Sequence, residues 1–172
     1  MCKLLGALCI MMSCTYLGLQ ISSIYRKRSE LFRFLQNGLT MLETEINYTA
    51  TPLPLALERV GKKNNKHCRS LFMKAAAALH EKRGVTASEA WAEGITALAG
   101  EVPLTKEEKE LLHLFGQELG GSAKEEQLKN IALTKKQLYG AQKAAEVEQT
   151  QKQKLWQYLG FCLGAVLVLM LI

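Results

Sequence analysis

Apolar residues recur every three or four positions through most of the middle of the chain, and the runs are separated by proline, glycine or helix-capping residues. This spacing places the apolar side chains on one face of an α-helix. It predicts helices around 31–46, 55–60 and 69–82. Two more run from the cap at 86 to the glycine at 100 and from the cap at 105 to the glycine at 120, and a last one starts at 122. No sustained alternation of apolar and polar residues predicts a strand. We therefore expect an all-α protein, an antiparallel six-helix bundle.

The predicted helix ends rest on specific residues. Pro52 and Pro54 stop the first helix, because proline lacks the amide donor and restricts the residue before it. Capping boxes, in which a hydroxyl and a Glu three residues later satisfy each other's amides, begin at Thr86, Thr105 and Ser122. Gly61 is expected to end the second helix, and residues 62–67 are expected to form a solvated basic turn.

The last helix carries a seam with alternating steps of three and four residues, the spacing of a helix pair. Its members are apolar at first and become more polar toward the C-terminus: Leu128, Ile131, Lys135, Leu138, Gln142, Ala145 and Gln149. The second half of this helix is expected to leave the bundle as a stalk. Gly140 is its predicted weak point, as Gly38 is in the first helix.

Both ends of the chain are apolar. Leu4–Ile24 and Leu155–Ile172 are each close to the length of about twenty residues that crosses a bilayer. Lys and Arg follow the first run and precede the second, which by the positive-inside rule places the middle of the chain in the cytosol and both termini across the membrane. A cleaved secretory signal is the rival interpretation, but the first run continues into a basic flank instead of a small-residue cleavage site.

This predicts a two-span transmembrane hairpin formed by extensions of the first and last helices, with a spanning helix at 1–25, a cytosolic bundle at 26–154 and a second spanning helix at 155–172. Small residues recur every four positions within the spans, at Cys14, Gly18 and Ser22 and at Gly160 and Gly164. Such spacing allows close packing of spanning helices, either on each other or on a partner, and it also arises by chance.

The amino-acid composition argues against most kinds of catalytic site. The net charge of +6 would suit nucleic acid, but the basic residues gather beside the apolar ends, which favours lipid head groups. The chain contains no Asp, no C-x-x-C and no glycine-rich phosphate loop, and its three His residues lack metal-ligand spacing. We expect no bound metal, no cofactor and no enzymatic activity. Glu43 and Glu45 are interpreted as solvated, and His67 with Cys68 as an ordinary surface pair.

Acidic residues gather on the fifth predicted helix and the start of the last one. Glu107, Glu108 and Glu110 are followed by Glu118, Glu125 and Glu126. Carboxylates in a first turn compensate the helix dipole, which suffices to explain the first two. Contact of this acidic region with a basic partner is the alternative, and the sequence leaves both open.

Several motifs, in order along nearly the whole chain, resemble the stage III sporulation protein AB family. They are KLLG at 3–6, LTMLETEINY at 39–48 with TPLPLAL at 51–57, EAW at 89–91 with Ile95, EEKELLHLFG at 107–116 with Leu119 and Gly120, and KLWQYLG at 154–160.

The resemblance implies a role in endospore-forming bacteria, in the mother cell at the outer membrane around the engulfed forespore. It implies a part in a transenvelope channel, together with other stage III proteins of the operon. It also implies a bundle similar to the cytosolic domain of type II secretion platform protein F, which meets a secretion ATPase. The hypothesis is a non-enzymatic membrane platform subunit. The alternatives are a scaffold with its bundle outside the cytosol and a membrane hydrolase using Cys68 or a Glu pair. The oligomeric state, a homo-oligomer included, stays open.

Overall fold

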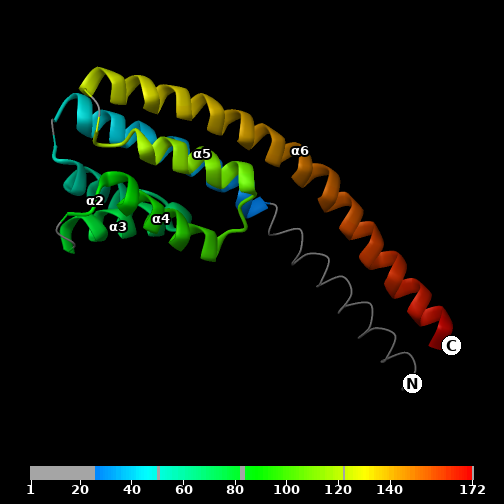
Figure 1. Cartoon of the computed structure of the whole chain (residues 1–172). Coiled ribbons are helices and arrows are strands. Elements are labelled where there is room, and N and C mark those ends of the chain that lie inside the picture. The colour runs from blue at the N-terminus through cyan, green and yellow to red at the C-terminus, as the bar shows by residue number, and fades with distance from the viewer. Residues whose placement is uncertain (1–25, 50, 82–83, 122, 172) are drawn as a thin grey trace. The chain divides into compact units, whose positions relative to one another are not determined.

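The computed structural model describes residues 26–49, 51–81, 84–121 and 123–171, and beyond Lys152 it describes the side chains of Leu155 and Tyr158 alone. A helix over residues 26–47 is followed by α2 (Leu53–Lys63), α3 (Lys66–Glu81), α4 (Ala87–Glu101), α5 (Lys106–Gln117) and α6 (Lys124–Leu171), as Figure 1 shows. No strand occurs in these ranges. The predicted all-α helical bundle is confirmed.

The chain divides into two compact units. Glu30–Gln142 forms the bundle unit, which contains α2 to α5 and the first part of α6. The stem unit consists of Met1–Ser29 and Lys143–Ile172, of which residues 26–29 and 143–171 are described. The first helix and α6 therefore contribute residues to both units.

The predicted spanning helix at 1–25 lies outside the described residues, and so do most side chains of the predicted span at 155–172. Among the described residues, no helix has both the length and the apolar character needed to span a membrane.

The core of the bundle unit is built on the apolar stripe of the first helix, where Leu31, Leu35, Leu39 and Leu42 are buried as predicted. Burying a leucine side chain stabilises the fold by roughly 1.5–3 kcal/mol. Trp91 lies at the centre of an aromatic cluster, with ring centroids 5.6 Å from Phe72 and 5.2 Å from Phe115, both in edge-to-face geometry. The core therefore unites the first helix with α3, α4 and α5.

Two helices extend beyond their predicted limits. Gly61 does not end α2, because it packs so closely on α3 that a Cβ there would lie 2.9 Å from the side chain of Met73. Lys62 and Lys63 consequently belong to the last turn of α2, where basic side chains compensate the helix dipole. The turn predicted at 62–67 is present but shorter, because only Asn64 and Asn65 lie between α2 and the start of α3 at Lys66.

Neither suspected weak point interrupts its helix. Gly38 lies inside the first helix, where a Cβ would come within 2.6 Å of the Phe72 ring, so the glycine permits a close helix contact. Gly140 lies inside α6 with no atom within 4 Å of its Cβ position. The long helix predicted from Ser122 onward is present from Lys124, with Ser122 itself outside the described residues.

The capping boxes at Thr86 and Thr105 are confirmed. In each, the Thr hydroxyl accepts from the amide of the Glu three residues later, and that Glu carboxylate accepts from the Thr amide. Because α5 starts at such a cap, its first turn is fixed in place, and with it the acidic residues that the sequence singled out.

Candidate functional site

The first helix and α6 run antiparallel in the bundle unit (Figure 1). They are joined by two polar pairs. Gln36 Nε2 donates to Gln142 Oε1 at 2.8 Å, and Lys135 Nζ donates to Glu43 Oε2 at 2.7 Å. The paired residues are seven apart in each helix, two helical turns, so both pairs lie along one side of the helix pair. We call them the polar pairs of the bundle unit.

The stem unit contains a pair with the same register. Ser29 Oγ donates to Gln149 Oε1 at 2.7 Å, seven residues before Gln36 on one helix and seven after Gln142 on the other. Beside it, Arg28 Nη1 lies 2.7 Å from Glu148 Oε2. Each unit therefore holds the two long helices together by polar contacts in one register.

The predicted seam of α6 is confirmed by these contacts. Its polar members Lys135, Gln142 and Gln149 all bind the first helix, and its apolar members Ile131, Leu138 and Ala145 are buried. The matching polar residues on the first helix, Ser29, Gln36 and Glu43, were missed. Their seven-residue spacing was the signal that could have found them.

Glu43 and Glu45 are not the solvated pair that the sequence suggested. Glu43 binds Lys135, and Glu45 lies 2.9 Å from Arg59 Nη1 with its side chain 14% exposed. A hydrogen bond from Thr51, together with the Arg59 guanidinium, lowers the pKa of Glu45. This contact ties the end of the first helix to α2.

Glu148 is the charged centre of the described stem unit. A hydrogen bond from Lys152 and the charge of Arg28 lower its pKa, so the carboxylate stays ionised near neutral pH. Arg28 and Lys152 belong to the basic flanks of the two predicted spans. The structure thus places one cation of each flank on a shared carboxylate.

The three acidic residues proposed to contact a partner differ in their surroundings. Glu108 is 7% exposed, and its carboxylate accepts from the Thr105 amide at 2.8 Å. Glu107 and Glu110 lie on the exposed surface of α5. The carboxylate of Glu108 therefore serves the helix cap, and of these three residues only Glu107 and Glu110 are exposed for contact with a partner.

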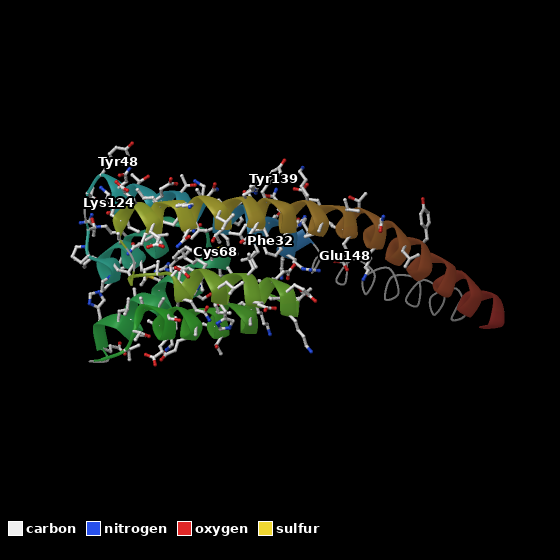
Figure 2. All side chains as sticks on the ribbon, turned by 45° about the horizontal axis from the view of Figure 1, so that its top comes forward. Phe32, Tyr48, Cys68, Lys124, Tyr139 and Glu148 are labelled. Atoms are coloured by element: carbon white, nitrogen blue, oxygen red, sulfur yellow. The ribbon has the colours of Figure 1, made fainter. Side chains whose placement is uncertain are left out.

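Cys68 is buried within the bundle (Figure 2), although the sequence analysis interpreted it as a surface residue. Its Sγ lies 3.6 Å from the Leu31 carbonyl oxygen, and burial raises the pKa of the thiol to about 12. A nucleophilic cysteine needs a lowered pKa and access to substrate. Cys68 is thus a core residue, and the alternative of a hydrolase loses its nucleophile.

The small residues predicted to pack the spans have no described side-chain contacts. Cys14, Gly18 and Ser22 lie outside the described residues, and Gly160 and Gly164 lie within the helical backbone of α6. Within the described part of the chain, no three His, Cys or acidic side chains come together as metal ligands do.

These features define a class: an all-helical bundle whose first helix and α6 are joined by polar contacts. The family model of stage III sporulation protein AB matches residues 3–172, and the chain belongs to this family. It is 33% identical to stage III sporulation protein AB of Bacillus subtilis (strain 168), over 99% of each chain. A solved structure of stage III sporulation protein AB is similar with a TM-score of 0.66 and 30% identity, covering 73% of this chain and 98% of that one. The family gives this protein a role in sporulation.

Proposed function

We propose that this protein is a non-enzymatic membrane platform subunit of a sporulation channel between mother cell and forespore. In this role it is an adaptor between a cytosolic secretion-type ATPase of the same operon and other stage III membrane proteins. The protein is placed on the mother-cell side, in the outer membrane around the forespore. The bundle lies in the cytosol and both termini lie across the membrane.

The observation that carries the proposal is the pairing of the first helix with α6. The polar pairs fix these two helices to each other in one register. Along the sequence, each helix leads into one of the apolar segments proposed to span the membrane as a hairpin, 1–25 and 155–172. A bundle attached to two paired helices suits the transmission of movement from an ATPase to membrane partners.

The charges of the stem unit support the membrane part of the proposal. Arg28 and Lys152 both contact Glu148, and Arg26 and Lys27, which precede Arg28 in sequence, are exposed. Cationic side chains next to a spanning helix are attracted to anionic lipid on the cytosolic leaflet. In the spans, Cys14, Gly18 and Ser22 are proposed to pack close to Gly160 and Gly164 or to the spans of a partner.

The experiment that tests the coupling compares two double variants of the full chain in sporulating cells. Gln36→Ala/Gln142→Ala removes a polar pair, whereas Asn37→Ala/Gln151→Ala removes exposed amides from the same two helices. We expect the first to lower the frequency of heat-resistant spores at least tenfold while the protein still co-purifies with the ATPase. The control variant is expected to sporulate normally. Normal sporulation of the first variant, or failure of the unaltered chain to bind the ATPase, would contradict the proposal.

A topology measurement separates this function from that of an external scaffold. Cys68 is too buried to serve as the probe, so Tyr48, which is 82% exposed at the end of the bundle, is replaced by Cys in a chain whose native cysteines are Ser. A membrane-impermeant maleimide is expected to leave Tyr48→Cys unlabelled in intact mother cells and to label it after lysis. Labelling before lysis would place the bundle outside the cytosol and support the scaffold.

A further inference from the structure

A groove of about 340 Å³ lies between α5 and α6, within the bundle unit. Leu114 and Phe115 of α5 and the C-cap residue Glu118 line one side, and Glu126, Asn130 and Leu133 of α6 line the other. The polar pairs and the aromatic cluster around Trp91 do not include these side chains, apart from Phe115. Apart from Phe115, the residues that line the groove are therefore not used by the contacts described so far.

The groove presents apolar side chains that the bundle does not bury. Leu114 is 54% exposed and Leu133 is 55% exposed, on opposite helices. Phe115 behind them is 4% exposed and belongs to the core. Two half-exposed leucines across a groove offer a place where an apolar side chain of another helix can be buried.

The charge of the groove is opposite to that of the chain. The chain carries a net charge of +6, yet the ionisable residues that line the groove, Glu118 and Glu126, are both acidic. Asn130 Nδ2 donates to Glu118 Oε2 at 3.3 Å and joins α5 to α6 at this point. Exposed Glu125 lies next to Glu126 in the first turn of α6. A ligand that matches this surface carries positive charge beside an apolar anchor.

We propose that the groove binds a basic amphipathic helix of a partner protein. An apolar side chain of that helix lies between Leu114 and Leu133, and Lys or Arg residues one or two turns away lie against Glu118 and Glu126. The residues from Glu126 to Leu133 span two turns of α6, about 10.5 Å at 1.5 Å per residue, which accommodates contacts from positions i, i+4 and i+7 of the bound helix. The groove binds this helix whether or not its owner is the ATPase.

The test is photocrosslinking in sporulating cells with the full chain, in which Leu133 is replaced by the photoreactive amino acid benzoylphenylalanine. Mass spectrometry then identifies the crosslinked peptide. We expect one partner segment with Lys or Arg at helical spacing around an apolar residue. Glu118→Lys/Glu126→Lys should reduce the crosslink at least tenfold, whereas Glu81→Lys/Glu101→Lys, which changes two exposed carboxylates elsewhere by the same charge, should leave it unchanged.

A second variant distinguishes the loss of charge from a loss of folded structure. Glu118→Gln/Glu126→Gln removes the charges but keeps an oxygen that can accept from Asn130, and it should reduce the crosslink several-fold. Crosslinks to lipid, to a second copy of this chain, or to a segment without basic residues would overturn the proposal. So would a crosslink that is insensitive to both groove variants. These outcomes leave ATPase co-purification unaffected, so failure here is distinct from failure of the proposed function.

Discussion

Gly94 lies where α4 crosses α3, and replacing it with Ala tests how closely these helices approach. A Cβ at this position would lie 2.5 Å from the Leu71 carbonyl oxygen and 3.1 Å from Leu71 Cδ1. The carbonyl oxygen belongs to the backbone of α3 and cannot rotate away as a side chain could. Gly94→Ala therefore requires the two helices to separate.

Two opposing effects set the magnitude. Alanine is more favourable than glycine in a helix interior by about 1 kcal/mol. Overpacking a tightly filled interior costs about 1–3 kcal/mol, and a clash with rigid backbone falls in the upper part of that range. The net loss is therefore about 1–2 kcal/mol, or about 2–8 °C in Tm at 2–4 °C per kcal/mol for a chain of this size.

Gly140→Ala is the matched control, because no atom lies within 4 Å of the Cβ position there. Only the propensity gain remains, so this variant is expected to raise the free energy of unfolding by up to about 1 kcal/mol. Thermal and urea unfolding of the full-length variants, followed by circular dichroism, measure both effects. A Gly94→Ala protein as stable as the unaltered chain would refute the close approach of α3 and α4.

Three further predictions follow from the contacts. In a variant that retains only Cys68, a thiol pKa of about 12 leaves about one thiolate in 10⁴ at pH 8. A disulfide reagent should therefore react with this thiol at least a hundredfold faster after denaturation. Equal rates would contradict the burial. Lys135→Glu should lower the free energy of unfolding by about 1 kcal/mol through repulsion of Glu43, and Glu43→Lys/Lys135→Glu should restore most of it, as a double-mutant cycle would measure. Because the folded-state pKa of Glu45 is lowered, its stabilising contribution is present above the unfolded value and is lost as the pH falls through the folded one. The difference in stability between the unaltered chain and Glu45→Gln should thus shrink between pH 6 and pH 3, and a constant difference would contradict the assigned contacts.

The parts of the fold that sequence could predict are those set by local chemistry. The stripe from Leu31 to Leu42 and the capping box at Thr105 depend on residues within a few positions of one another, so they were predicted correctly. Gly61 was misjudged because its intrinsic cost of about 1 kcal/mol in a helix is offset by packing on Met73, a contact that sequence does not show. Cys68 was misjudged for the same reason, since its burial depends on the first helix lying over it.

The candidate site was only half accessible to sequence. The seam of α6, including Gln142, followed from its spacing, but its partner Gln36 stood in a helix whose leucine stripe dominated the pattern. The groove between Leu114 and Leu133 could not be predicted, because it requires α5 and α6 to lie side by side with both leucines at the surface. The spacing of residues within one helix does not show which other helix packs beside it.

The polar pairs of the bundle unit also determine how the first helix and α6 respond to a pull along their axes. A slide by one heptad would bring Gln36 opposite Lys135 and Glu43 opposite Leu128, which breaks the amide pair and sets a carboxylate against an aliphatic side chain. The two helices therefore resist sliding past each other along their axes. Under a force along the helix axes, we therefore expect the first helix and α6 of the bundle unit to respond as one element, because sliding would first have to break both polar pairs.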